Sequence, residues 1–536
     1  MRKSDLNSQS EFLETTFISI PDLIESETKR YGHRTALIVD SVSLTFDALK
    51  RFVDKTAAAL QCGGLGHGDC VAICAQSSIE YVVTFLAGLR AGIVVAPLPT
   101  SASPEALKSM IVDSSAQIIF YDRTCMDLVQ SATLEIKIHK VLFEEKESIL
   151  KEGHRYYRHW PAEPARPFDK VNIEPDWPFN IIYSSGTTGT PKGIVQSHAM
   201  RWNYVRRAKA YGYHNTPTTL LSTPLYSNTT LVSFFPTLAY GGTAILMPKF
   251  DAGKYLELAQ EYKVTHTMLV PVQYQRIMAC ENFSRFDLSR FQTKQCTSSP
   301  FKPELKQKVL EKWPGGLFEA YGMTEGGATF ILAAHEHPHK LHTVGLPAEG
   351  CEVRFINDQG EEVLPGEAGE IVGHSPGMMD KYLNQPEKTA EVEYYDDSGK
   401  RFIRSGDIGR LDEDGFLILL DRKKDMIISG GFNIYPSDLE TVLIKHPQVK
   451  EVAVVGVPSE KWGETPVAFV VPVKVATITP QNIVDWTNLR LGKMQRLADA
   501  VIIDKLPRSV IGKVLKIELR ATYLEYGHAS KNDQMV

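Results

Sequence analysis

The stretch YSSGTTGTPKG, residues 183–193, decides how the fold of the whole chain is predicted. Three glycines let its backbone turn sharply, serines and threonines add hydroxyl groups, and Lys192 adds a positive charge. Such a loop can close around phosphate oxygens. Its spacing differs from the common phosphate loop G-x-x-x-x-G-K-[ST], because Pro191 stands where the second glycine is needed. The loop therefore predicts a phosphate site, but not that of a P-loop NTPase.

The composition is that of a globular protein with more than one domain. The chain has 536 residues, 43% of them apolar and 23% charged, with a formal charge of −5. This acidic balance argues against a nucleic-acid partner. The seven cysteines form no C-x-x-C pair, and no signal peptide or transmembrane segment is recognisable. We expect a cytoplasmic protein without stable membrane insertion, and the residues leave a homo-oligomer open.

Helical and strand-like segments alternate along the first 420 residues. Apolar residues at helical spacing alternate with short apolar runs at 46–60, 68–75, 79–92, 93–99 and 116–122, and apolar runs recur at 244–248 and 264–271. This alternation predicts parallel strands with helices on both faces. Residues 345–421 are richer in short strands, and the pattern restarts after residue 425 as a small domain. The polar residues 528–536 are expected to fray.

Four motifs in a fixed order carry a family resemblance. The stretch at 183–193 resembles the signature Y-[TS]-S-G-T-T-G-x-P-K-G of the adenylate-forming superfamily. The other signatures are matched by YGMTEGG (321–327), RSGDIGRLDEDGFLILLDRKKDMIISGGFNIYPSDLE (404–440) and LPRSVIGKVLK (506–516). The resemblance covers about residues 20 to 525. It implies an α/β fold with a large multi-subdomain N-terminal domain (1–421), a hinge (422–425) and a small mobile α+β C-terminal domain (426–536).

The superfamily activates carboxylates, and this chemistry explains its charged residues. A carboxylate becomes a good acyl donor once it is joined to AMP, but two anions must first be brought together. The resemblance implies that Lys513 bridges the acid and the α-phosphate and that Thr324 meets the same phosphate. It also implies ATP and Mg²⁺, with Glu325 and Thr188 as metal ligands. The phosphate loop then comprises Ser184, Ser185, Gly186, Thr187, Thr188 and Lys192.

The resemblance also assigns residues to the nucleoside and to coenzyme A. It assigns the adenine and its surroundings to Ser298, Ser299, Pro300, Glu319, Ala320 and Tyr321. It assigns the ribose to Asp407 and Arg422. Gly430 and Gly431 resemble the loop that lines the pantetheine channel. The resemblance implies that Lys513 serves only the first half-reaction, so the small domain is expected to rotate between the two steps, with Lys424 at the hinge.

The acid pocket departs from the family pattern. Its expected lining is Tyr226, Ser227, Val270, Pro271, Thr297, Ser298, Met323 and Thr329, a mixture that favours a medium-chain or aromatic acid. TSSPF (297–301) stands where the family usually has Gly-Gly-Ala-Pro-Leu, so Thr297 and Ser298 are expected to fill part of the acyl tunnel. Tyr226 and Ser227 stand where many relatives carry a histidine gate. Asp421 replaces a usual glycine, and nothing in the sequence explains it.

The predicted function is that of an acid–CoA ligase that uses ATP, Mg²⁺ and coenzyme A. The alternative is an acyl-AMP ligase or adenylation enzyme that passes the acyl group to a carrier protein or another acceptor. No carrier domain follows residue 525, which disfavours a modular peptide synthetase. The chain also lacks the insertion of fatty acyl-AMP ligases and the C-terminal peroxisomal tripeptide typical of luciferases.

Overall fold

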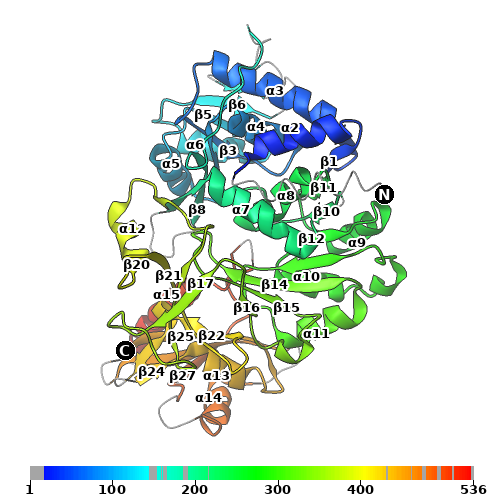
Figure 1. Ribbon diagram of the computed structural model, residues 1–536. Coiled ribbons are helices and arrows are strands. Elements are labelled where there is room, and N and C mark those ends of the chain that lie inside the picture. Colours follow the sequence, from blue (N-terminus) through cyan, green and yellow to red (C-terminus); the bar gives the residue numbers. More distant parts are fainter. Residues whose placement is uncertain are drawn as a thin grey trace. The chain divides into compact units, whose positions relative to one another are not determined.

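The chain divides into two compact units. Figure 1 labels their helices and strands. The computed structural model describes residues 17–143, 154–157, 160, 166–184, 191–214, 216–429, 432–459, 462–473, 478–491, 496–509 and 512–532. The first unit comprises residues 1–341, 347–352 and 373–403, and the second comprises 342–346, 353–372 and 404–536. About half of the β-rich segment therefore clusters with the C-terminal residues, and the domain boundary at 421–426 stays a prediction.

The first unit contains two large sheets. One has the order β19 (Lys381–Tyr382), β9 (Lys192–Ser197), β8 (Pro178–Ser184), β4 (Val94–Pro97), β3 (Cys70–Cys74), β5 (Ile118–Tyr121), β6 (His139–Leu142) and β7 (His154–Tyr156). Its strands from β8 to β7 are parallel, whereas β9 and β19 are antiparallel to their neighbours. The loop at 183–193 thus joins two antiparallel strands, β8 and β9, and α7 begins only at His198.

The second sheet supplies a row of parallel strands. Its order runs β16 (Leu346–Pro347), β15 (Thr329–Ala333), β14 (Gly316–Gly322), β13 (Thr293–Cys296), β12 (His266–Leu269), β10 (Thr218–Leu221), β11 (Thr243–Leu246), β1 (Thr35–Val39) and β2 (Val42–Thr45). The strands from β14 to β1 pair in parallel. The predicted α/β class is confirmed.

Helices of the first unit connect these strands and begin where the sequence offers a cap. They are α2 (Ile20–Tyr31), α3 (Phe46–Cys62), α4 (Ile79–Arg90), α5 (Pro104–Asp113), α6 (Met126–Ala132), α7 (His198–Ala208), α8 (Asn228–Ala239), α9 (Ala252–Glu261), α10 (Pro271–Met278), α11 (Pro303–Lys312) and α12 (Pro386–Val392). The side chains of Thr45 and Ser78, for example, accept from the first turns of α3 and α4. Both helices lie where the periodicity predicts them.

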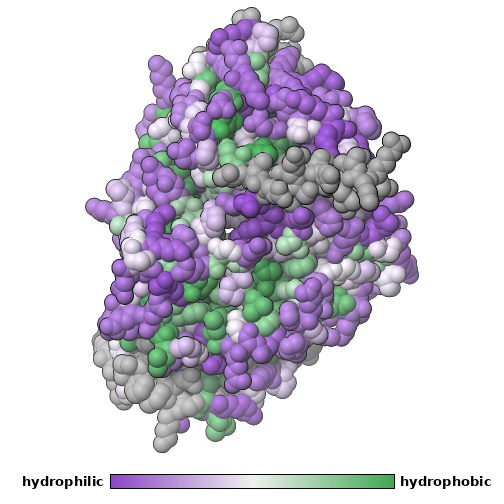
Figure 2. All heavy atoms as spheres, viewed as in Figure 1, coloured by the Kyte–Doolittle hydropathy of each residue, from purple (hydrophilic) through white to green (hydrophobic). Residues whose placement is uncertain are grey.

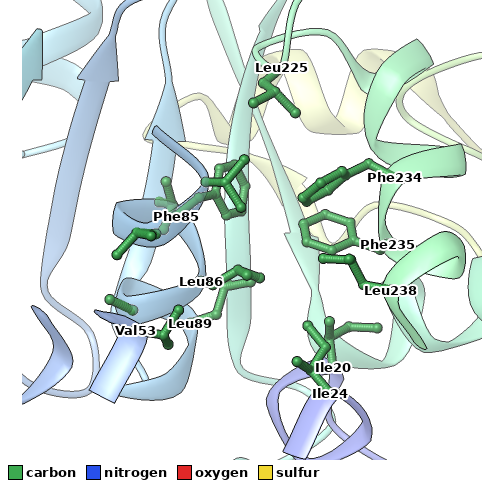
Figure 3. Close-up of a cluster of buried hydrophobic side chains, with 14 of the residues drawn as sticks. Ile20, Ile24, Val53, Phe85, Leu86, Leu89, Leu225, Phe234, Phe235 and Leu238 are labelled. Atoms are coloured by element: carbon green, nitrogen blue, oxygen red, sulfur yellow. The ribbon is translucent and has the colours of Figure 1, made fainter. Parts of the chain in front are cut away.

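Apolar side chains from α2, α4 and α8 form part of the main core of this unit. Figure 3 shows side chains of two helices pointing toward one another: Phe85, Leu86 and Leu89 from α4, and Phe234, Phe235 and Leu238 from α8. The rings of Phe85 and Phe235 lie 5.6 Å apart at 61°, an edge-on contact. Burial of each such side chain stabilises the fold by about 1.5–3 kcal/mol.

The described residues of the second unit form two smaller sheets and three α-helices. One sheet contains β17 (Glu352–Ile356), β18 (Gly369–His374), β21 (Arg401–Leu411) and β22 (Leu417–Arg422). The other has the order β24 (Phe432–Ile434), β23 (Ile427–Ser429), β26 (Gly463–Pro472) and β25 (Val449–Ser459), with β27 (Asp499–Ile502) parallel to β26. The helices are α13 (Pro436–Leu443), α14 (Pro480–Asn488) and α15 (Lys516–Asn532). Residues 528–532 are therefore helical, where fraying was predicted.

The described surface carries no sign of a membrane span. Figure 2 shows hydrophilic residues over most of the visible face, with apolar residues in small separate groups. Among the described residues, no helix combines the length and the apolar character needed to cross a bilayer.

Candidate active site

The predicted acid-pocket residues come together at one edge of the second sheet. β10, β12, β13 and β14 are parallel neighbours, so their carboxyl ends meet at the same edge. The residues that follow these ends include Tyr226 and Ser227 after β10, Val270 and Pro271 after β12, Thr297 and Ser298 after β13, and Met323, Thr324 and Glu325 after β14. Thr329 begins β15 opposite Gly322. One edge of one sheet therefore gathers the whole predicted lining.

Ser298 and Thr297 occupy glycine positions of the family in different ways. Ser298 adopts φ +82°, a conformation that glycine takes without strain and serine rarely takes. Its hydroxyl lies 2.7 Å from the hydroxyl of Thr229 in α8, which helps to hold it there. The Thr297 hydroxyl donates instead to the carbonyl oxygen of Ala320 at 2.8 Å and ties β13 to β14. Of the two, Ser298 has its hydroxyl paired with a side chain of α8, whereas the Thr297 hydroxyl bonds the backbone of β14.

Replacing Ser298 with glycine should widen the range of acids. Ser298→Gly removes the hydroxymethyl group while keeping a backbone that glycine tolerates at this φ. We expect kcat/KM for adenylation of acids one methylene or ring substituent larger than the best substrate to rise about tenfold. Adenylation kinetics over a graded acid series measures this effect. The neighbouring substitution Ser299→Gly is the control, and an unchanged size preference in Ser298→Gly would remove Ser298 from the pocket.

The turn after β14, which carries Thr324 and Glu325, is held from three directions. The side-chain amide of Gln196 in β9 donates to the Thr324 carbonyl oxygen at 2.8 Å. The backbone N–H of Met379 donates to the Glu325 carbonyl oxygen at 2.7 Å, and the hydroxyl of Tyr382 donates to Glu325 Oε1 at 2.7 Å. Both residues with predicted phosphate and metal roles thus lie on a turn with a fixed backbone.

A buried arginine supports this arrangement. Arg201 in α7 is 1% exposed and donates through Nε and Nη2 to Asn180 Oδ1, at 3.0 and 2.9 Å, and through Nη2 to the side chain of Gln196. Burial lowers the pKa of Arg201 to about 10. Gln196 therefore has its oxygen fixed by Arg201 while its amide holds Thr324. Sequence reasoning missed these residues, because a polar residue within a helix or strand carries no mark of its burial.

Other predicted residues of the first unit have identifiable partners. Lys192 begins β9, with its ammonium 3.3 Å from the Tyr382 hydroxyl, and Ser184 ends β8. The Glu319 carboxylate is buried against Lys306 of α11, and burial raises the pKa of Glu319. Its side chain therefore serves packing between β14 and α11. Burial also raises the pKa of Tyr226, whose hydroxyl lies beside those of Thr100 and Ser101.

The adenine-side residues follow or belong to neighbouring strands. Ser299 and Pro300 come directly after Ser298 at the end of β13, and Ala320 and Tyr321 belong to β14. The Tyr321 ring lies 6.1 Å from that of Phe330 on the paired strand β15. Ser185, Gly186, Thr187 and Thr188, together with Gly430 and Gly431, lie outside the described residues.

In the second unit, four predicted residues form a charged cluster. Asp407 on β21 faces Arg422 on β22 across an antiparallel pair, and Arg422 Nε lies 2.9 Å from Asp407 Oδ1. Lys513 is fixed by a tight turn in which Ser509 N–H donates to its carbonyl at 2.8 Å and its own N–H donates to Ser509 Oγ at 3.1 Å. Burial, and then Arg422 and Lys424, lower the pKa of the Lys513 ammonium to about 8.

The segment 422–425 is anchored by ion pairs on both sides of Lys424. The ammonium of Lys423 lies 2.9 Å from Asp358 and 3.1 Å from Glu370, both of which precede the segment in sequence. Asp425 Oδ1 lies 3.2 Å from Nη2 of Arg520 in α15, and Arg520 follows the segment in sequence. Lys424 itself is exposed. Among these ion pairs, the change from upstream to downstream partners occurs at Lys424, the residue predicted to be the hinge.

The structure accounts for Asp421, which the sequence left unexplained. One carboxylate oxygen accepts from the N–H of Arg422 at 2.7 Å, and the other accepts from the N–H of Ser437 at 3.0 Å. Ser437 lies in the first turn of α13, whose free N–H groups and dipole favour a carboxylate. Asp421 thus caps α13 from a distant strand, although burial raises the pKa of Asp421. A glycine could not do so.

The described residues fit a magnesium ion bound through phosphates rather than a protein cage. No cluster of three or more histidine, cysteine, aspartate or glutamate side chains suited to a metal occurs in the described part of the chain. Mg²⁺ takes one or two carboxylates and fills its other positions with phosphate oxygens and water. Glu325, oriented through one oxygen by Tyr382, suits that pattern.

Comparison with known proteins identifies the family of this chain. Residues 24–383 match the family model of AMP-binding enzymes, and residues 438–513 match that of the AMP-binding enzyme C-terminal domain. The chain belongs to the AMP-binding, adenylate-forming enzyme family. This adenylate-forming enzyme is 33% identical to a feruloyl-CoA synthase of an Amycolatopsis species over 92% of its own chain and 96% of the relative.

Two further relatives support the acyl-CoA synthetase type. The adenylate-forming enzyme is 31% identical to the indoleacetate–CoA ligase of Aromatoleum aromaticum, over 91% of this chain and 94% of the relative. The solved structure of ATP-bound MatB from Rhodopseudomonas palustris is 28% identical, with a TM-score of 0.84, covering 94% of this chain and 99% of that one. The adenylate-forming enzyme is thus an acid–CoA ligase by relationship, and ATP binding is supported.

Proposed function

We propose that this enzyme joins an aromatic carboxylic acid to coenzyme A in two steps driven by ATP and Mg²⁺. The observation that carries the proposal is the fixed Thr324–Glu325 turn at the carboxyl edge that also gathers the acid-pocket residues. The names of two relatives, a feruloyl-CoA synthase and an indoleacetate–CoA ligase, support an aromatic acid. The small polar and apolar residues of the predicted pocket are compatible with a flat ring.

The first proposed step forms the acyl-adenylate. An acid carboxylate oxygen attacks the α-phosphorus of ATP, the bond to the β-phosphate breaks, and pyrophosphate leaves. Lys192 and the loop at 183–193 would hold phosphate oxygens, Thr324 would donate to the α-phosphate, and Glu325 would bind the metal. Lys513 would offset the charge that accumulates between the acid and the phosphate. When bound, Mg²⁺ supplies further positive charge to the phosphates.

The second proposed step transfers the acyl group. The thiolate of coenzyme A attacks the acyl carbon, the bond to AMP breaks, and the thiol proton passes to solvent. The ion pairs on either side of Lys424 support a pivot at this residue, because upstream partners hold Lys423 and a downstream partner holds Asp425. In this proposal the rotation removes Lys513 and brings the loop with Gly430 and Gly431 to the acyl-adenylate.

The proposed role of Lys513 predicts a pH dependence. Its lowered pKa, about 8, means that the free enzyme loses the ammonium as the pH rises through that value. Since only the charged form offsets the developing negative charge, kcat/KM for adenylation should fall about tenfold per pH unit above about pH 8. Stopped pyrophosphate-release assays from about pH 6.5 to 9.5 measure the profile. Lys513→Arg, which stays charged, should retain a lower but flat activity in this range, and a fall of equal slope in that variant would contradict the assignment.

Acid-dependent exchange of labelled pyrophosphate into ATP tests the function as a whole. The panel would contain arylacrylic, arylacetic and benzoic acids and fatty acids of C4 to C12. The proposal expects the highest exchange with an aryl acid, and a thioester when coenzyme A is added. Exchange without thioester would favour the alternative acceptor, whereas a preference for fatty acids would overturn the aromatic assignment. No exchange with any acid would overturn adenylation.

A further inference from the structure

Three side chains of the first unit meet at one hydroxyl group. The ammonium of Lys192 lies 3.3 Å from the Tyr382 hydroxyl and 4.4 Å from the centroid of its ring. The same hydroxyl donates to Glu325 Oε1 at 2.7 Å. Among the described residues, no direct ion pair joins Lys192 to Glu325, and the tyrosine oxygen contacts both charged groups. The sequence motifs assigned roles to Lys192 and Glu325 but none to Tyr382.

The surrounding backbone fixes Tyr382 firmly. It is 3% exposed and packs with Ile194, Met379 and Ile403. Strand β19 pairs with β9, placing Tyr382 opposite Ile194, and the N–H of Leu383 donates to the Gly193 carbonyl oxygen at 2.7 Å. The N–H of Tyr382 donates to Thr389 Oγ1 at 3.0 Å. The hydroxyl is therefore held next to both the end of the phosphate loop and the Thr324–Glu325 turn.

Two opposite charges this close would otherwise attract each other. A direct pair between the Lys192 ammonium and the Glu325 carboxylate would engage both groups before nucleotide arrives. Lys192 would then have to leave a carboxylate to reach phosphate, and Glu325 would have to leave an ammonium to reach a cation. A neutral hydroxyl that accepts from one and donates to the other satisfies both groups with weaker bonds.

We propose that Tyr382 is a positioning residue that keeps Lys192 and Glu325 from pairing with each other. Each group then remains available for its own ligand, phosphate oxygens for Lys192 and the nucleotide-bound divalent cation for Glu325. The inference rests on the proposed function only in that the nucleotide binds with its metal at this turn. It needs neither a particular acid nor coenzyme A.

Calorimetry of a non-hydrolysable nucleotide tests the inference without turnover. The dissociation constant of α,β-methylene-ATP is measured with excess Mg²⁺ and again with EDTA. The constant in EDTA divided by the constant in Mg²⁺ reports how much the bound metal, with Glu325 as its ligand, strengthens nucleotide binding. In Tyr382→Phe the freed charges should pair, and the ratio should fall about tenfold, the effect of one charge-assisted hydrogen bond. Thermal stability should change little, because the ring and its packing remain.

A second substitution separates charge pairing from mere loss of orientation. Lys192→Met in the Tyr382→Phe background removes the competing ammonium, so the ratio should recover to within about threefold of the parent, although the nucleotide binds more weakly in both conditions. The control is Tyr395→Phe, an exposed tyrosine whose hydroxyl also donates to a glutamate, Glu393, at 3.3 Å. Its ratio should equal that of the parent.

The outcomes distinguish this inference from the proposed function. An unchanged ratio in Tyr382→Phe, or a ratio that stays low in the double variant, would overturn the role of Tyr382 and leave adenylation standing. Failure of the parent protein to bind the nucleotide at all would overturn both. A fall in Tyr382→Phe that Lys192→Met reverses would establish the spacer role.

Discussion

Lys513→Ala is expected to lower acid-dependent pyrophosphate exchange at least about 10³-fold, comparable to losing a main donor to a developing negative charge. Lys513 lies in a charged cluster with Asp407 and Arg422 and is held by the turn at Ser509. Alanine removes the ammonium but leaves this turn, whose hydrogen bonds involve only the backbone of residue 513 and Ser509. The variant should therefore fold normally and fail at adenylation.

The same variant should still form thioester from a supplied acyl-adenylate. In the proposed scheme Lys513 has left the site by that step, so AMP release from synthetic acyl-adenylate and coenzyme A should be largely unchanged. Lys505→Ala, which removes an exposed lysine from the same region, is the control for surface charge. An equal loss of both half-reactions in Lys513→Ala would show that the two steps share this lysine and would contradict the division between them.

Gly326→Ala is expected to cause the greatest loss of stability among the changes considered, at least about 3 kcal/mol. Gly326 adopts φ +78°, and a Cβ there would lie 1.9 Å from the carbonyl oxygen of Gly377. Because the obstacle is backbone, no side chain can rotate away. The turn carrying Thr324 and Glu325 would have to shift, so pyrophosphate exchange should be lost together with stability. Thermal unfolding and exchange assays measure the two effects.

Gly322→Ala provides a matched control within the same motif. A Cβ on Gly322 would have its nearest neighbours, the Ala328 carbonyl oxygen and Thr329 Oγ1, at 3.5 Å, an ordinary contact. Its unfolding midpoint should stay near that of the parent protein. Equal midpoints for both alanine variants would mean that the turn after β14 yields easily, and the fixed-turn description of Thr324 and Glu325 would be wrong.

The sequence predicts the α/β elements well because their signals are local. Apolar spacing at 79–92 gives α4 (Ile79–Arg90), and the apolar run at 68–75 gives β3 (Cys70–Cys74). Both patterns can be recognised from residues that are close together in sequence. The motif residues are also recognisable, because their order along the chain is distinctive. The motifs do not reveal which other residues hold them in place.

The supporting residues could not be predicted because their contacts are distant in sequence. Tyr382 is 190 residues from Lys192 and 57 from Glu325, and Gln196 is 128 residues from Thr324. The residues on either side of a tyrosine or glutamine in a short strand do not indicate which distant residue it will contact. Asp421 is similar: it breaks the family pattern, and its reason is a helix N-terminus 16 residues away. These roles become visible only when the strands are paired.

The anchored segment around Lys424 has a consequence for how the proposed rotation proceeds. Lys423 pairs with Asp358 and Glu370, and Asp425 pairs with Arg520, so the proposed rotation would draw mainly on the backbone torsions of Lys424. In the proposed rotation, such a joint would favour a few discrete arrangements over a continuous range of them. Removing the ion pairs of Lys423 or of Asp425 would allow more arrangements of the segment. The enzyme would then spend more time in arrangements that serve neither half-reaction.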